Sequence, residues 1–261
     1  MRFFFTILSV VFLPFFSEAQ FYYGLQTDFG KRRVQYKEFN WTSYQFKKFD
    51  SYYYRGGKPL AEYTARQAHI ILQKIEQELL FDFEDRIQFI IYNSFSEFKQ
   101  SNIGYKQHDD YNIGGRTQIV GNKVMLYFDG DYNHINTQIS AGITGILLNK
   151  ILYGGNIADA FTNSTLLNLP SWFLDGLVAY IVNPWNLQID NLVKDKIGTE
   201  DFKNFNHLEK EDAKLAGYSI WHYISNTYGK DAIAEILYMV RNSRNVESSF
   251  QFVLGKSVKT I

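Results

Sequence analysis

The hydrophobic pattern of this chain changes near residue 130, and that change limits the possible folds more than any other feature. The part before it holds short runs rich in aromatic and β-branched residues, which are typical of strands, at 45–54, 86–93, 117–120 and 123–128. The last two runs flank Gly121-Asn122 and therefore predict a hairpin. Among these runs, apolar residues recur with a period near 3.6 over residues 58–80, which predicts a helix.

The part after residue 130 carries helical patterns. One long stripe covers residues 133–152 and ends at Gly154-Gly155, and Pro170 opens a second that continues to about residue 182. A polar connector is expected at about 184–214, followed by helices over 216–228, 231–241 and 246–254. This order predicts an α+β fold, in which an N-terminal mixed β-sheet with a packed helix precedes a mostly helical C-terminal half.

The composition limits the functions that the chain can have. Its 261 residues are 46% hydrophobic, which is enough for one large core. The 27 basic residues equal the 27 acidic ones, so no overall field attracts nucleic acid, and no nucleic-acid partner is expected. The absence of cysteine excludes disulfides, thiolate metal sites and cysteine nucleophiles.

The first 19 residues have the pattern of a signal peptide. Arg2 precedes an apolar run over residues 3–16, and Ser17-Glu18-Ala19 offers small residues for cleavage. The alternative is a membrane anchor, but the run is shorter than the ~20 residues that a bilayer span needs. We therefore expect a mature chain that begins at Gln20, with no stable membrane span, in a periplasmic or extracellular space. Residues 20–44 are expected to be a loosely held lead-in segment.

Two segments of the C-terminal half resemble the active-site helices of a protease family. The first, residues 139–147, reads Ile-Ser-Ala-Gly-Ile-Thr-Gly-Ile-Leu, and the second, residues 169–180, reads Leu-Pro-Ser-Trp-Phe-Leu-Asp-Gly-Leu-Val-Ala-Tyr. They are similar to Leu-Ala-His-Glu-Leu-Thr-His-Val-Leu and Leu-Pro-x-Trp-Phe-x-Glu-Gly-Leu-Ala-x-Tyr of the gluzincin, peptidase MA-like metallopeptidases. The resemblance implies a zincin-like domain over residues 45–261.

The same resemblance implies that the catalytic groups are missing. Ala141 and Gly145 stand at the positions of the two zinc-binding histidines, Gly142 at that of the general-base glutamate, and Asp175 at that of the third ligand. Alanine and glycine carry no donor atoms, and one carboxylate does not hold zinc. No metal, no cofactor and no catalysis are therefore expected, with Trp172 and Asp175 at a possible vestigial cleft. The two helical glycines indicate either close packing or an opened cleft.

The function that the resemblance implies is a secreted, inactive peptidase-like domain. It would bind a protein partner, or serve in assembly, in a bacterial envelope. In related bacterial proteins such a domain precedes β-propeller repeats of the TolB type, so this chain is expected to be the N-terminal module of a longer protein. A structural spacer without a specific partner is one alternative. A hydrolase with a relocated site, using Asp175 with residues such as His134 or Glu76, is another. None of the five histidines has a histidine partner at i+4.

Overall fold

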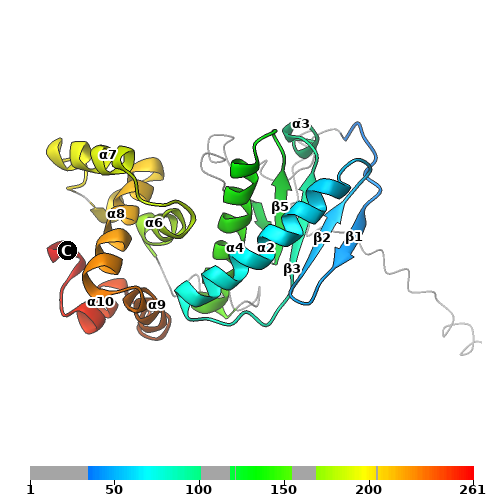
Figure 1. Cartoon of the computed structure of the whole chain (residues 1–261). Helices are drawn as coiled ribbons and strands as arrows, with labels where there is room; N and C mark the ends of the chain where they lie inside the picture. The colour runs from blue at the N-terminus through cyan, green and yellow to red at the C-terminus, as the bar shows by residue number, and fades with distance from the viewer. Residues whose placement is uncertain (1–34, 101–117, 121, 155–168, 204) are drawn as a thin grey trace, which may run out of the picture. The chain divides into compact units, whose positions relative to one another are not determined.

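The computed structural model describes residues 35–100, 118–120, 122–154, 169–203 and 205–261. A mixed β-sheet lies in the N-terminal half of this part of the chain (Figure 1). Its strands are β1 Thr42–Gln45, β2 Phe49–Tyr53, β3 Ile87–Tyr92, β4 Gln118–Val120 and β5 Lys123–Tyr127. Their order across the sheet is β1-β2-β3-β5-β4. The three inner strands run parallel, whereas β1 and β4 pair antiparallel at the two sides.

The sheet corrects the prediction of one strand over residues 45–54. This segment holds the end of β1, a turn, and β2, and Gln45 pairs with Asp50 across the turn. The Phe46 N–H donates to the Phe49 carbonyl at 2.9 Å, and Lys47 is exposed in the turn. The aromatic run misled the prediction because aromatic residues occupy both strands and the turn. Since β1 begins at Thr42, the last residues of the expected lead-in also belong to the sheet.

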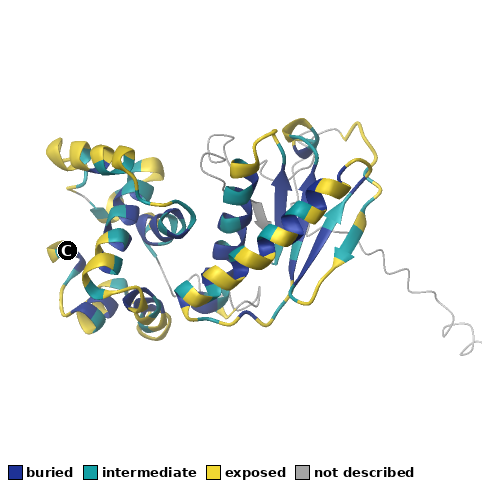
Figure 2. Cartoon of the chain, viewed as in Figure 1, coloured by how far each residue is buried: buried dark blue, intermediate teal, exposed yellow. Residues whose placement is uncertain are grey.

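Two long helices cover one face of the sheet (Figure 1). Helix α2, Lys58–Leu79, contacts β2, and helix α4, Tyr132–Tyr153, contacts β5 and α2. Helix α4 begins at Asp131, whose side chain accepts a hydrogen bond from the Asn133 N–H at 2.8 Å, and it ends at Gly154 in the left-handed region. The main apolar core lies between these helices and the alternate residues of the strands that face them (Figure 2).

The other face of the sheet carries a second, aromatic core. Ile90 and Tyr92 of β3 point to this face, because successive side chains of a strand alternate between faces. They pack with Phe98 of the short helix α3, Phe95–Phe98, and with Phe39 and Trp41 from the segment before β1. The sheet is therefore apolar on both faces, which explains the unbroken apolar run at residues 89–92.

The C-terminal half is helical, and the helices are α6 Ser171–Val182, α7 Leu187–Gly198, α8 Lys210–Tyr228, α9 Asp231–Ser243 and α10 Val246–Leu254. Short 3-10 turns occur at Phe205–His207 and Val258–Thr260. The predicted α+β fold, with an N-terminal mixed sheet and a mostly helical C-terminal half, is thereby confirmed.

Helix α7 corrects the prediction of a polar connector over residues 184–214. The Asn186 side chain accepts from the Ile189 N–H at 3.0 Å, and an ion pair joins Asp190 to Lys194 at 2.6 Å. Val193 is the one residue of α7 that is buried, so the helix lacks the apolar stripe from which a helix is predicted.

The described residues belong to one compact unit, whereas the expected signal peptide and most of the expected lead-in segment lie outside the described part of the chain. Within this unit, α4 contacts both α6 and α9, and one apolar core includes residues from the sheet and from the C-terminal helices. None of the helices in the described residues combines the length and the apolar character needed to cross a bilayer.

Candidate functional site

The positions singled out by the sequence lie on two helices that contact each other, α4 and α6. On α4, Ala141 and Gly142 are buried and Gly145 is half-buried. On α6, Trp172 is buried and Asp175 is half-buried. The resemblance therefore selects positions on neighbouring elements.

Gly142 lies where α4 packs most closely on the sheet. A Cβ atom placed on this glycine would lie 2.4 Å from Cγ1 of Val124 in β5, closer than real Cβ contacts come. Of the two interpretations of this glycine, close helix–sheet packing therefore holds. The side chain of Val124 fills the space that the side chain of a general-base glutamate would enter.

Trp172 belongs to the core. Its side chain is 1% exposed, its indole N–H donates to Oδ1 of Asn206 at 3.1 Å, and its ring packs 4.9 Å from the ring of Phe205. A residue in this environment packs the C-terminal half and does not line an open cleft. Asp175 thus remains the one candidate for the expected vestigial cleft.

Helices α6 and α8 cross at a pair of glycines. A Cβ on Gly217 would lie 1.9 Å from the carbonyl oxygen of Trp172, and a Cβ on Gly176 would lie 2.3 Å from the Cα of Gly217. Beside the crossing, the Trp221 indole N–H donates to the carbonyl of Phe173 at 2.9 Å, and their rings pack edge to face. The second segment of the resemblance, which lies on α6, therefore packs directly against α8.

Glu76 and His134, the two residues named as possible partners of Asp175 in a relocated hydrolytic site, lie in different places. Glu76 pairs with Lys48 at 2.8 Å and accepts from the Phe83 N–H at 2.9 Å, and both partners precede strands β2 and β3. His134 pairs with Asp129, and both follow the end of β5. Because β2, β3 and β5 are parallel, these two groups lie at opposite ends of the sheet.

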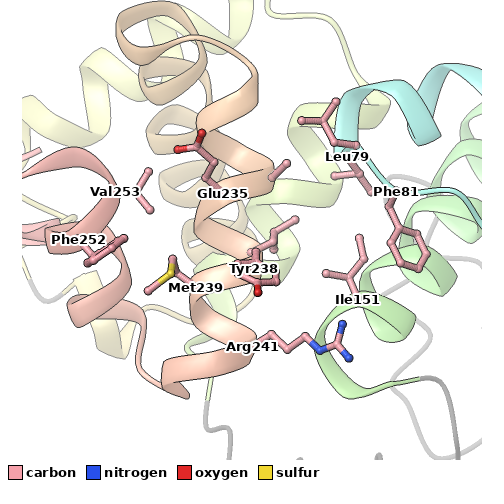
Figure 3. Close-up of a pocket in the computed structure, with 12 residues that line it drawn as sticks. Leu79, Phe81, Ile151, Glu235, Tyr238, Met239, Arg241, Phe252 and Val253 are labelled. Atoms are coloured by element: carbon pink, nitrogen blue, oxygen red, sulfur yellow. The ribbon is translucent and has the colours of Figure 1, made fainter.

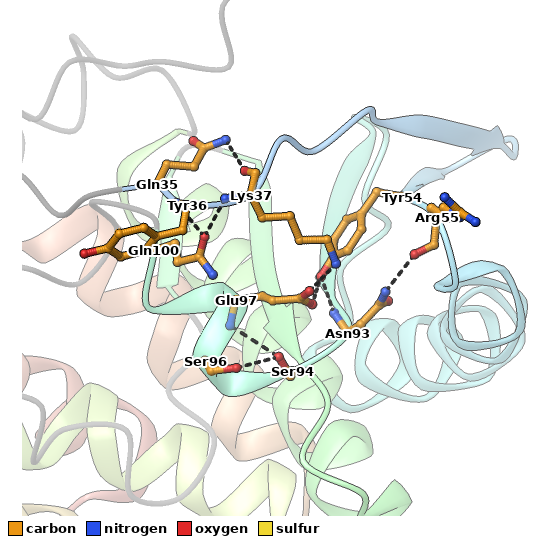
Figure 4. Close-up of polar contacts among 10 residues, drawn as sticks. All are labelled: Gln35, Tyr36, Lys37, Tyr54, Arg55, Asn93, Ser94, Ser96, Glu97 and Gln100. Carbon is orange, nitrogen blue, oxygen red and sulfur yellow. Dashed lines mark hydrogen bonds and ion pairs between the residues drawn. The ribbon is translucent and has the colours of Figure 1, made fainter.

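A polar cluster that the sequence analysis missed lies at the ends of β2 and β3 (Figure 4). The phenol of Tyr54, which is 2% exposed, donates a hydrogen bond to Glu97 and accepts one from the Asn93 N–H at 2.7 Å. Lys37 forms an ion pair with Glu97, and its Nζ lies 5.0 Å from the centre of the Tyr54 ring. The Ser94-x-x-Glu97 spacing predicts the capped helix but not these distant partners.

The protonation states in this cluster follow from burial and hydrogen bonding. Burial, followed by the hydrogen bond to Glu97, raises the pKa of the Tyr54 phenol well above its ordinary value. Burial alone would raise the pKa of Glu97, but the hydrogen bonds from Lys37 and Tyr54 outweigh it and lower the pKa. The cluster thus pairs a neutral phenol with a charged carboxylate and fastens the segment before β1 to the start of α3.

Among the described residues, no three His, Cys, Asp or Glu side chains lie close enough together to hold a metal ion. The cluster of His108, Asp109 and Asp110, which the sequence suggests as a surface loop, lies outside those residues. Comparison of the chain with protein-family models and with curated proteins finds no match.

Proposed function

We propose that the chain is a zincin-like, peptidase MA-like domain that has lost catalysis and acts by binding. The order of elements supports this proposal. A sheet with an antiparallel strand beside β5 leads into α4, the counterpart of the metal helix, and α6 then packs against α4 as the counterpart of the helix with the third ligand.

The observation that carries the loss of catalysis is the contact between Gly142 and Val124. In a zinc peptidase the glutamate at this position takes a proton from the metal-bound water. Here the helix is seated so closely on β5 that even a methyl group at Gly142 would overlap a valine side chain. Restoring the glutamate would therefore require α4 to move away from the sheet.

The proposed role is binding or assembly in a bacterial envelope, with a protein as the partner. The signal-peptide pattern of residues 1–19 supports secretion into a periplasmic or extracellular space. The resemblance supports a place before β-propeller repeats in a longer protein.

The metal geometry can be tested by restoring the two histidines. If Ala141 and Gly145 correspond to the zinc ligands, the variant Ala141→His/Gly145→His should bind Co²⁺ together with Asp175 and give the visible absorption of a tetrahedral site. The added substitution Asp175→Ala should remove this absorption, whereas Asp190→Ala on α7 should leave it unchanged. A folded double variant, checked by circular dichroism, that binds no Co²⁺ would show that the zincin-like assignment is wrong.

The loss of catalysis is tested on the unaltered protein. We expect no stoichiometric zinc by elemental analysis and no cleavage of a broad peptide library. Zinc-dependent cleavage that is abolished by Asp175→Ala would instead support the hydrolase.

A further inference from the structure

A cavity of about 570 Å³ lies between the C-terminal ends of α2 and α4 on one side and α9 and α10 on the other (Figure 3). Its walls are mostly apolar, and Leu79, Ile151 and Leu237 form part of them. The volume is in the range of small-molecule sites, which are about 300–1,000 Å³. A hollow of this size suits a compact ligand.

Large apolar side chains remain exposed around this cavity. Leu80 is 63% exposed, Tyr238 is 62% exposed and Phe252 is 74% exposed, and all three line it. Exposed apolar side chains that gather around one hollow commonly mark a binding site in a protein.

Two charged residues of α9, Glu235 and Arg241, also line the cavity. Neither forms an ion pair with another of the described residues. They are six positions apart, so their Cα atoms are separated by about 9 Å along the helix axis. In Figure 3 the Arg241 guanidinium lies beside Ile151, and the Glu235 carboxylate lies at the other end of the labelled face of α9.

The guanidinium is the group better suited to bind a charged ligand here. It is weakly hydrated and presents a planar fork of donors that fits a carboxylate. An ammonium group on a ligand would pair with Glu235 as a point charge, without the two parallel hydrogen bonds that the guanidinium fork can form with a carboxylate.

We propose that this cavity binds a small anionic amphiphile, such as a medium-chain aliphatic carboxylate. The aliphatic part of the ligand would lie against the exposed apolar lining, Leu80, Tyr238 and Phe252, and the carboxylate would accept hydrogen bonds from Arg241. This site is separate from the positions on α4 and α6 and does not depend on the proposed loss of catalysis.

The proposal is tested by calorimetric titration of the purified protein with octanoate, decanoate, decanol and decylamine below their micelle concentrations. Each additional buried CH₂ should lower the dissociation constant about fourfold. Decanoate should bind more tightly than decanol, and decanol more tightly than decylamine. Equal binding of acid and alcohol, tighter binding of the amine, or no saturable binding of any of them would overturn the proposal.

Two substitutions on the same helix separate the contribution of charge from that of packing. Arg241→Gln should weaken decanoate binding by up to about fivefold and leave decanol binding unchanged, since Arg241 is exposed and an exposed ion pair contributes about 0.2–1 kcal/mol. Glu235→Gln, the matched control, should not weaken decanoate binding. Phe252→Ala should weaken acid and alcohol by the same factor. Decanoate binding that is indifferent to Arg241→Gln would rule out the assigned role of the guanidinium.

Discussion

At the scale of single residues, Glu97 of the sheet half is held by two hydrogen-bond donors. Its carboxylate receives hydrogen bonds from Lys37 and Tyr54 at a side chain that is only 16% exposed. Because these bonds favour the charged form over the opposing effect of burial, the pKa of Glu97 is lower in the folded state than in the unfolded chain. The unfolded chain therefore binds a proton at Glu97 more readily than the folded chain. The stabilisation of the folded state by this carboxylate is fully present above the ordinary pKa of glutamate, and it is lost as the pH falls through the pKa of Glu97 in the folded state.

Glu97→Gln should therefore lower the free energy of unfolding by about 1–2 kcal/mol at pH 7 and by less at pH 3. Urea unfolding at the two pH values measures this difference. The matched control is Glu200→Gln, because Glu200 pairs with Lys203 on an exposed surface and should change stability by less than about 0.5 kcal/mol at either pH. An equal loss at pH 7 and pH 3 in Glu97→Gln would contradict the assigned role of its charge.

At the scale of elements, glycines set how closely the helices approach their neighbours. Gly142 allows α4 to seat on Val124 of β5, and Gly176 and Gly217 allow α6 and α8 to cross. Gly198, at the end of α7, differs from these three, because a Cβ placed on it would meet nothing within 4 Å among the described residues. A helical glycine is therefore required for packing only where another element lies against it.

Gly142→Ala should destabilise the protein by about 1–3 kcal/mol through overpacking against Val124. In a Val124→Ala background the same change should cost less, because the two methyl groups that it overlaps are gone and only the Cβ of residue 124 remains near it, at 3.3 Å. Gly198→Ala, the matched control, should stabilise by about 0.4–1 kcal/mol. Thermal and urea unfolding of the four proteins in the Gly142–Val124 cycle gives the coupling free energy, and a coupling near zero would contradict the close contact.

The sequence predicts the elements whose apolar residues are periodic and misses those whose residues are not. The burial of Leu72, Ile75 and Leu79 on α2 follows the period of 3.6 from which that helix was predicted. Helix α7 was missed because its stability comes from the Asn186 cap and charge pairs, which leave no stripe. The Tyr54–Glu97 cluster was missed because its partners are distant in the chain, and only the fold brings them together.

At the scale of the whole molecule, the sheet half and the helical half of the compact unit share one apolar core. Ile91 of β3 and Trp221 of α8 belong to the same cluster of buried residues, and α4 contacts elements of both halves. Loss of packing in the sheet should therefore also destabilise the C-terminal helices, because the two halves should unfold in one cooperative transition.

Ile91→Ala should destabilise this transition by about 2–5 kcal/mol, since the side chain is fully buried. The measurement is urea unfolding followed by tryptophan fluorescence in a Trp41→Phe/Trp185→Phe background. In that background only Trp172 and Trp221, both in the helical half, emit. Leu187→Ala, which removes an exposed side chain, should leave the midpoint unchanged. If Ile91→Ala leaves the unfolding midpoint measured by tryptophan fluorescence unchanged but accelerates hydrogen exchange in β3, the two halves unfold separately.

The contact of Gly176 with Gly217 has a consequence for how this chain can change over time. The main chains of α6 and α8 meet there without an intervening side chain, so a gain of even one carbon atom at either position forces the helices apart. Surface charges on both helices can change without this effect. The two glycines cannot, so relatives of this chain should be recognised by that pair even after most other positions of the two helices have diverged.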